Sequence, residues 1–208
     1  MTVAVLAIAT RNAHKVDEIW AILSPLLPHV HREEVASALD LDAPSPVEDG
    51  VTFEANALIK ARALAASTGL PALADDSGIA VEVLGGSPGV FSALWAGAHG
   101  DDDANLRLLL AQLADVPDQH RGAAFVCAAA LVLPDGREYV EVGRMEGRIV
   151  REAHGDGGFG YDPIFVATGQ EVSNAQLSAQ AKNEISHRGA AFRAMAPHVA
   201  AVLAEPGR

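Results

Sequence analysis

The sequence has little cysteine, little lysine and an excess of negative charge. Cys127 is its only cysteine and lies in the apolar run AAFVCAAALVL, so no intrachain disulfide is possible and the thiol is expected in the core. The formal net charge of −12 argues against non-specific binding to a nucleic-acid backbone or an anionic membrane surface. Any phosphate-binding site must therefore be a local group of cations in an acidic protein.

Long apolar runs are also missing. The opening TVAVLAIAT is too short to span a bilayer and lacks the charged region of a signal peptide, so it predicts a buried strand and a cytoplasmic location. Half of the residues are apolar, which excludes global disorder. A chain of 208 residues suits one α/β domain, with or without two lobes.

Among the 15 cationic residues, arginine is preferred. Only three are lysines: Lys15, Lys60 and Lys182. In such a chain each lysine is a candidate for a role that requires a compact ammonium group rather than a planar guanidinium. The alternative is that three surface positions carry lysine by chance.

Strands alternate with helices along the chain. This order, with one antiparallel hairpin, predicts an α/β fold with a mixed central sheet, helices packed around it and no linker between independent domains. The expected strands are Val3–Ala9, LPALA, IAVEVL, a hairpin of Phe125–Leu133 and Arg137–Val142 around PDG, and Ile164–Ala167. The expected helices are His14–Leu26, a helix capped by Thr52 that runs through Ser67 to a stop at Gly69, a helix after Asp101–Asp103, and helical material from Ala175 to Ala204 interrupted near SHRG. A polar loop is expected at 42–50 and a turn at DDSG.

The stretch AHGDGGFGYDPIF contains the dinucleotide fingerprint G-x-G-x-x-G at Gly155, Gly157 and Gly160. That fingerprint binds a pyrophosphate only where it follows a strand and opens a helix. Here Pro163 restricts Asp162 to an extended conformation, so no helix is expected to follow and NAD binding is disfavoured. The loop instead offers an aromatic face for stacking and an acceptor carboxylate, which favours binding of a base.

Two of the lysines lie at the start of a predicted helix or on one. In ATRNAHK, a buried strand ends and a helix begins, where backbone N–H groups and Lys15 can bind phosphate; the alternative is that Asn12 is an ordinary helix cap. Lys60, in TFEANALIKA, has Glu54 and Asn56 upstream, and a solvated helix face is its simplest interpretation. No Walker motif G-x-x-x-x-G-K-[ST] is present.

Consecutive acids in LADDSG follow a predicted strand. Asp75 and Asp76 are carboxylates of the kind that hold Mg²⁺, and the alternative is an Asx turn that leads into Gly78.

The third lysine lies in AKNEISHRGAA, a segment rich in hydrogen-bond donors. These donors suit phosphate oxygens or the oxo edge of a base. They are Lys182, Asn183, Ser186, His187 and Arg188.

Five motifs in order, ATRNAHK, VEDGVTFEANALIKA, ADDSGIAVEVLGGSPGVFSALWAG, GFGYDPIF and KNEISHRGAA, resemble the inosine/xanthosine triphosphate pyrophosphatase family and extend from residue 9 to residue 191. The resemblance implies hydrolysis of deaminated purine nucleoside triphosphates (dITP, ITP, XTP) to the monophosphate and pyrophosphate, which keeps abnormal purines out of DNA and RNA. It implies one two-lobed domain over 1–208, with a long mixed sheet and a deep nucleotide cleft, a homodimer and a Mg²⁺ cofactor.

The resemblance also assigns site residues by motif position. Catalysis falls to Asp76, Lys15, Glu48 and Lys60, with Asp76 and Glu48 at the metal. The triphosphate falls to Thr10, Arg11, Asn12, Ala13, His14, Lys15 and Ser77, and the purine and sugar to Phe159, Gly160, Tyr161, Asp162, Lys182, His187 and Arg188. The chain departs from the family pattern at Arg11, Leu94-Trp95 and Gln176, where the family more often has Asn, Arg-Tyr and Glu.

Two other functions remain as alternatives. A pyrophosphatase of related fold would act on other modified nucleotides, such as abnormal pyrimidines. A non-catalytic nucleotide-binding sensor would have no use for an acid pair linked to a metal.

Overall fold

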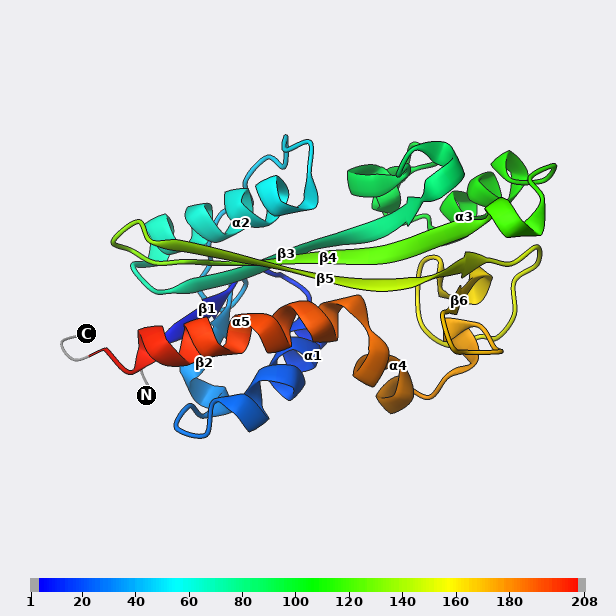
Figure 1. The fold of residues 1–208 in the computed structure, drawn as a ribbon. Coiled ribbons are helices and arrows are strands. Elements are labelled where there is room, and N and C mark those ends of the chain that lie inside the picture. The colour runs from blue at the N-terminus through cyan, green and yellow to red at the C-terminus, as the bar shows by residue number, and fades with distance from the viewer. Residues whose placement is uncertain (1–3, 206–208) are drawn as a thin grey trace. The chain divides into compact units, whose positions relative to one another are not determined.

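The computed structural model describes residues 4–205, apart from the side chains of Ala13 and His14, as alternating strands and helices (Figure 1). The strands are β1 (Leu6–Ile8), β2 (Val35–Ser37), β3 (Ala72–Val81), β4 (Gly122–Val132), β5 (Glu138–Ile149) and β6 (Phe165–Ala167). The α-helices are α1 (Ala13–Leu23), α2 (Phe53–Thr68), α3 (Asp102–Gln112), α4 (Ala179–Ile185) and α5 (His187–Leu203). Short 3₁₀ helices are η1 (Ser24–Leu26), η2 (Arg32–Glu34), η3 (Glu82–Leu84), η4 (Gly89–Leu94), η5 (Asp118–His120), η6 (Asp162–Ile164) and η7 (Asn174–Gln176).

In the described chain the strands form a six-stranded mixed sheet in the order β2-β1-β3-β4-β5-β6. β1 pairs in parallel with both β2 and β3, whereas β5 pairs antiparallel with β6. β4 and β5 are joined by the turn at PDG, where the Leu133 N–H donates to the Arg137 carbonyl at 2.9 Å. The α/β class, the mixed sheet with flanking helices and the hairpin are confirmed.

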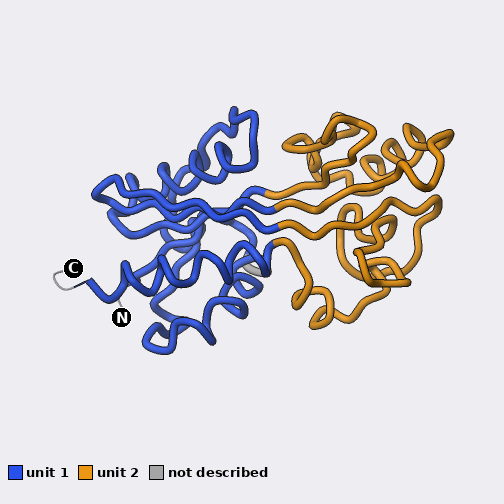
Figure 2. Tube along the Cα trace, in the orientation of Figure 1, with its two compact units in different colours: residues 1–76, 127–143, 188–208 blue, residues 77–126, 144–187 orange. Residues whose placement is uncertain are grey.

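The chain divides into two compact units (Figure 2). Of the described residues, unit 1 contains 4–76, 127–143 and 188–205, and unit 2 contains 77–126 and 144–187. The chain passes between the units within β3, β4 and β5 and at the start of α5. The single two-lobed domain with a nucleotide cleft stays a prediction.

Unit 1 places its strands between two helical layers (Figure 1). α1 and α5 cover one face, where Leu73 of β3 packs with apolar side chains such as Phe192. α2 covers the other face with alanines, and Ala57 packs near Ala74 of β3. Successive side chains of a strand point to opposite faces of the sheet. Leu73 points to the face covered by α1 and α5, and Ala74 points to the face covered by α2. The next two residues of β3, Asp75 and Asp76, are therefore expected on opposite faces as well.

The ends of α2 follow from its sequence. The Thr52 hydroxyl accepts a hydrogen bond from the Ala55 N–H at 3.2 Å and so caps the first turn. Gly69 ends the helix with a φ of 69°, a left-handed conformation that glycine adopts without strain. Both predicted helix signals are confirmed.

The predicted turn at DDSG, between two short strands, is wrong. β3 runs without a break from Ala72 to Val81, so Asp75 and Asp76 lie inside a strand that has neighbours on both sides. A cationic side chain pairs with each carboxylate and offsets the free-energy cost of burying the acids in the sheet. Gly78 also belongs to the strand, and a larger residue does not fit there because a Cβ would lie 2.3 Å from the Ser92 hydroxyl oxygen.

The expected strand IAVEVL is wrong in its second half, because β3 ends at Val81 and Glu82–Leu84 form the 3₁₀ helix η3. Two other boundaries agree with the sequence. The Asp101 carboxylate accepts from the Ala104 N–H at 3.0 Å, so the acidic run is a helix N-terminus, as predicted. The C-terminal helical region is interrupted at Ser186, which separates α4 from α5. Within residues 4–205, no helix is long and apolar enough to cross a membrane.

The core of unit 2 contains a buried arginine. The Arg121 guanidinium donates to three backbone carbonyls, those of Ile149 at 2.9 Å, Leu113 at 2.5 Å and Val150 at 3.0 Å. Leu113 is the C-cap of α3, and Ile149 is the last residue of β5. One side chain therefore satisfies carbonyl groups at the ends of two elements.

Replacing this arginine should destabilise the protein. Arg121→Met keeps most of the volume but leaves buried carbonyls without donors, so we expect a loss of about 2 kcal/mol and a fall of roughly 4–8 °C in the thermal midpoint. Differential scanning calorimetry measures it. Arg107→Met is the control, because Arg107 is exposed on α3 and its ion pair is with the equally exposed Asp103. Equal midpoints for the two variants would contradict the role given to Arg121.

Candidate functional site

The first polar group in unit 1, here the Asp76 cluster, consists of Glu48, Asn56, Lys60 and Asp76. The Lys60 ammonium donates to Glu48 Oε2 and to Asp76 Oδ1, both at 2.8 Å. Asn56 donates its amide to Asp76 Oδ2 at 3.3 Å and accepts from the Gly50 N–H at 2.8 Å. Asn56 therefore links the loop that carries Glu48 to strand β3.

Burial and charge act against each other in the Asp76 cluster. Burial alone would lower the pKa of Lys60, but the neighbouring carboxylates of Asp76 and Glu48 outweigh it, so that pKa is raised and the lysine stays charged. Burial raises the pKa of Asp76, because the opposing effects of Lys60 and Asn56 are smaller. The result is a carboxylate held in a partly desolvated site beside a fixed cation.

The second group in unit 1, the Asp75 cluster, consists of Lys15, Glu18, Asp75 and Arg188. Lys15 Nζ lies 2.8 Å from Asp75 Oδ1, and Arg188 Nε lies 3.3 Å from Asp75 Oδ2. Arg188 also pairs with Glu18 at 2.9 Å. Burial by itself would raise the pKa of Asp75, but the charges of Lys15 and Arg188 hold it well below its usual range.

Cys127 lies beside this cluster. Its thiol is buried and donates to Asp75 Oδ2 at 3.9 Å. Burial, followed by the charge of Asp75, raises the pKa of the thiol, so it remains protonated and unreactive. The expectation that Cys127 is a small core residue is confirmed.

The two consecutive acids point to opposite faces of β3. Asp75 meets Lys15 of α1 and Arg188 of α5, whereas Asp76 meets Lys60 of α2. The interpretation of Asp75 and Asp76 as one pair of metal ligands at a strand end is therefore corrected, since they lie within the strand and serve different clusters. Asp76 is instead linked to Glu48 by Lys60, which pairs with both carboxylates.

The loop before α1 is ordered by its own hydrogen bonds. The Thr10 hydroxyl accepts from the Asn12 N–H at 3.1 Å, and Arg11 donates to the Ala43 carbonyl at 3.2 Å. The Asn12 carbonyl accepts from the Lys15 N–H at 3.1 Å, which opens the first turn of the helix. The side chains of Ala13 and His14, also expected at the phosphates, lie outside the described part of the chain.

Unit 2 holds a third polar group, the Phe159 cluster, made of Phe159, Asp162, Asn174 and Lys182. Asp162 is buried, and its carboxylate pairs with the Lys182 ammonium and accepts from the Phe159 N–H at 2.9 Å. The Lys182 ammonium lies 4.6 Å from the centroid of the Phe159 ring, and that ring is 56% exposed. A cation held over the face of an exposed aromatic ring suits a flat ligand that carries acceptor atoms.

Other residues expected at the base contact neighbouring residues of unit 2. Tyr161 is buried, and its hydroxyl donates to the Ser92 carbonyl at 2.8 Å. His187 is buried and stacks on Phe125 at 5.0 Å. The Gly160 N–H donates to Asp102 at 3.0 Å. Ser77, expected at the triphosphate, is a partly exposed residue of β3.

The glycine loop leads into the 3₁₀ helix η6 and then into β6. The expected extended conformation of Asp162 is wrong, because this residue opens η6. An α-helix does not follow the loop, so the structural condition for a dinucleotide fingerprint is not met.

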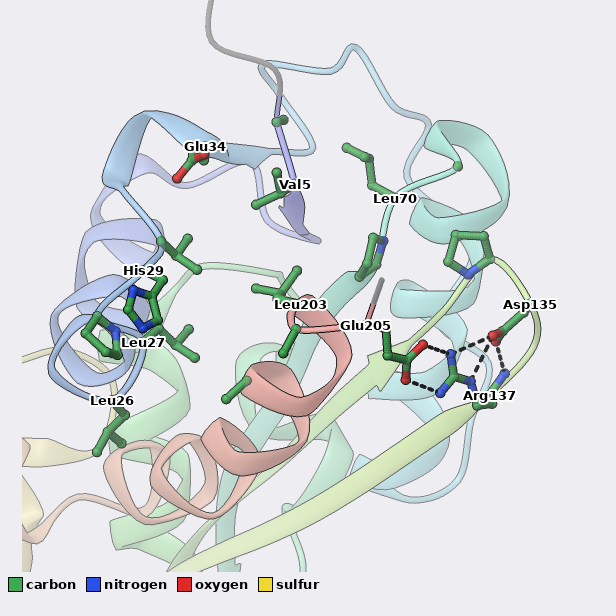
Figure 3. Close-up of a pocket in the computed structure, with 18 residues that line it drawn as sticks. Val5, Leu26, Leu27, His29, Glu34, Leu70, Asp135, Arg137, Leu203 and Glu205 are labelled. Carbon is green, nitrogen blue, oxygen red and sulfur yellow. Dashed lines mark hydrogen bonds and ion pairs between the residues drawn. The ribbon is translucent and has the colours of Figure 1, made fainter. Parts of the chain in front are cut away.

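A cavity of about 790 Å³ in unit 1 contains none of the expected site residues (Figure 3). Its walls include Val5, Leu27 and Leu203. At its rim Arg137 forms ion pairs with Glu205 at 2.6 Å and with Asp135 at 2.8 Å. Arg137 is outnumbered by the carboxylates of Asp135 and Glu205, and the other walls named here are apolar, so the cavity is a less suitable site for an anionic substrate than the three clusters.

Several important contacts were not among the expected site residues. Asn56 precedes Lys60 by four residues and therefore shares its helix face. This spacing could have indicated that Asn56 belongs to the same cluster as Lys60. Glu18 and Asn174 gave no such signal, because their partners Arg188 and Asp162 are distant in sequence or lie across a loop. Gln176 caps η7 by accepting from the Ser173 N–H at 3.1 Å, a contact that a glutamate could also make.

The described residues contain no group of three or more His, Cys, Asp or Glu side chains able to hold a metal ion. Chemically, unit 1 offers two desolvated cation–carboxylate clusters, and unit 2 offers a stacking surface with a cation. Lysines fixed beside carboxylates suit a polyanionic ligand that reacts with water.

The Ham1 family model matches residues 6–198. Among curated proteins, a dITP/XTP pyrophosphatase of Streptomyces coelicolor is 56% identical over 199 residues, 95% of this chain and 98% of its own. A solved nucleoside-triphosphatase (dITP/XTP pyrophosphatase) of Mycobacterium abscessus is 47% identical, with a TM-score of 0.76 over 96% of this chain and 99% of its own. A HAM1 protein of Coxiella burnetii has a TM-score of 0.84 at 37% identity, with 96% and 98% covered.

Proposed function

This chain belongs to the Ham1 family, and on that premise we propose that it hydrolyses dITP, ITP and XTP to the nucleoside monophosphate and pyrophosphate, which keeps abnormal purines out of DNA and RNA. The observation that carries the proposal is the Asp76 cluster, where one partly buried lysine bridges two carboxylates at 2.8 Å each. A protein that only binds a nucleotide has no need to hold Glu48 and Asp76 together against their repulsion.

The phosphates are assigned to unit 1. Lys15 and Lys60 present compact ammonium groups whose positions are fixed by Asp75 and Asp76. Such pre-oriented charges stabilise the negative charge that develops on a leaving pyrophosphate without reorganising at the moment of reaction. The N–H groups at the start of α1 add further donors.

Mg²⁺ is proposed as the cofactor, and the residues present fit it. Mg²⁺ takes one or two protein carboxylates and completes its shell with water and substrate phosphates. Glu48 and Asp76 are two such carboxylates, already drawn together by Lys60. When bound, the ion would neutralise charge on the phosphate oxygens.

The reaction is a displacement at the α-phosphorus. The oxygen of a water molecule forms a bond to the α-phosphorus, and the bond from that phosphorus to the α–β bridging oxygen breaks, so that pyrophosphate leaves. The water gives up a proton to a carboxylate of the Asp76 cluster, Asp76 or Glu48. Lys60 holds both acceptors in place.

The purine is assigned to unit 2. Phe159 offers a face on which a base can stack, and the Lys182 ammonium offers donors to acceptor atoms at the edge of that base. The 6-oxo group of hypoxanthine and xanthine is such an acceptor, whereas adenine presents an amino donor there. ATP is therefore proposed as a poor substrate.

A homodimer and a cytoplasmic location complete the proposal. Support for a second copy comes from large apolar side chains exposed on η3 and η4 of unit 2, namely Val83, Phe91 and Leu94. Leu94 stands where the family more often has arginine, so this position offers an apolar side chain instead of a charged one.

The products of dITP hydrolysis test the function. With Mg²⁺ present, we expect pyrophosphate and dIMP in equal amounts, measured by anion-exchange chromatography. Orthophosphate with accumulation of dIDP would overturn the assignment. A panel of modified pyrimidine triphosphates tests the rival pyrophosphatase, and Asp76→Asn shows whether turnover belongs to this protein or to a contaminant.

A further inference from the structure

Asn174 is a buried residue of unit 2 with an unusual hydrogen-bond state. It is 1% exposed, and its amide nitrogen donates to Asp162 Oδ1 at 3.3 Å. Its amide oxygen has no hydrogen-bond partner among the residues that the structure describes. A buried acceptor without a donor destabilises a fold, so a buried asparagine in this state calls for an explanation.

The orientation of this amide is fixed by chemistry. If the amide were turned around, its oxygen would face the Asp162 carboxylate, so that one acceptor would meet another. The backbone is fixed as well, because Ser173 and Gln176 form a capping box around η7 and the Gly157 N–H donates to the Ala175 carbonyl at 3.1 Å. Asn174 therefore presents its N–H₂ group to Asp162 permanently.

The Asp162 carboxylate connects Asn174 to Phe159 and Lys182. Its Oδ1 accepts from Asn174, and its Oδ2 accepts from the Phe159 N–H and the Lys182 ammonium. Gly158 leaves room for this carboxylate, since a Cβ there would lie 2.3 Å from Asp162 Oδ2. Because Asp162 is 2% exposed and both of its oxygens are occupied, it is better placed to hold its neighbours than to contact a base.

Lys182 depends on this support. It lies on α4, a helix of seven residues, and its long side chain loses considerable rotamer freedom when it is held over Phe159. A donor that is already in place binds an acceptor on a stacked base with less loss of entropy than a mobile one.

We propose that Asn174 is a positioning residue for the base, which acts through Asp162 to hold Lys182 over the exposed ring of Phe159. This inference rests on the proposed function, because it assigns the base to the Phe159 cluster. It predicts that loss of the Asn174 amide weakens binding of the base and leaves binding of the phosphates unchanged.

Binding measurements separate these two ends of the substrate. For Asn174→Ala we expect the Kd of dIMP, measured by isothermal titration calorimetry, to rise about tenfold, the factor for a hydrogen bond of ~1.4 kcal/mol. The Kd of pyrophosphate should change by less than about twofold. In turnover, KM for dITP should rise with little change in kcat. Asn174→Asp, which removes the donor but keeps the volume, should act in the same direction.

A double-mutant cycle tests the route through Lys182. In a Lys182→Met background, Asn174→Ala should change the Kd of dIMP by less than about twofold. Asn105→Ala is the matched control, because Asn105 is a buried asparagine of unit 2 whose amide contacts Ala96 at 2.7 Å and Ala93 at 3.2 Å. It should lower the thermal midpoint without changing the Kd of dIMP.

Three results would contradict the role given to Asn174. Additive effects in the cycle, an unchanged Kd of dIMP in both Asn174 variants, or equal losses for dIMP and pyrophosphate would each overturn the inference. If the wild-type protein binds dIMP but releases no pyrophosphate from dITP, the proposed function fails while the binding data still decide the role of Asn174. If it does not bind dIMP, both fail.

Discussion

Asp76→Asn is expected to lower kcat for dITP by at least about a hundredfold while leaving the protein folded. The substitution keeps the shape of the side chain and removes the negative charge that Lys60 contacts at 2.8 Å. That charge is proposed to act at the metal and at the attacking water, where its effect is greatest in the transition state. A hundredfold loss corresponds to about 2.7 kcal/mol of barrier. Steady-state kinetics with pyrophosphate detection measures it.

Stability distinguishes this loss from a structural defect. Burial raises the pKa of Asp76, so the ionised carboxylate is less stable in the folded chain than in the unfolded one, and its removal should leave the thermal midpoint unchanged or higher. Asp103→Asn, on an exposed side chain of α3, is the control and should change neither quantity. A variant at Asp76 that retains more than about a tenth of wild-type kcat would remove it from the catalytic groups.

Asp75→Asn, one residue earlier, should have the opposite effect on stability. The Asp75 carboxylate is the buried counter-charge that Lys15 and Arg188 share, so its removal breaks both of these ion pairs, although Arg188 keeps its pair with Glu18. Removing one partner of a buried ion pair is strongly destabilising, so we expect a loss of about 3 kcal/mol and a fall of roughly 6–12 °C in the thermal midpoint. Calorimetry of the two neighbouring variants under identical conditions makes the comparison.

The sign of the difference is the decisive result. The pKa of Asp75 is held well below its usual range, so the ionised Asp75 carboxylate stabilises the folded chain. The pKa of Asp76 is raised, so the ionised Asp76 carboxylate destabilises the folded chain. Similar changes in midpoint for Asp75→Asn and Asp76→Asn would show that the two carboxylates do not occupy different environments. That result would remove the separation of the Asp75 and Asp76 clusters.

The sequence by itself determined the elements that carry local signals. Thr52 and Gly69 marked the ends of α2, and Asp101 marked the start of α3, because caps act through backbone groups only a few residues away. The five ordered motifs also determined the family, since each motif combines several residue types at fixed spacing. All three lysines fall in the clusters that the motifs indicate.

Only the tertiary structure decided which of these residues act together. Read locally, DDSG has the composition of a turn, but strands on both sides and cations on both faces make it part of β3. The strand then sends Asp75 and Asp76 to different helices, and Arg188 reaches Asp75 across 113 positions of sequence. Likewise, Tyr161 is buried and Phe159 exposed, although both aromatic residues belong to one short motif. Such choices depend on burial and on long-range charge pairing, and these become defined only when distant segments pack together.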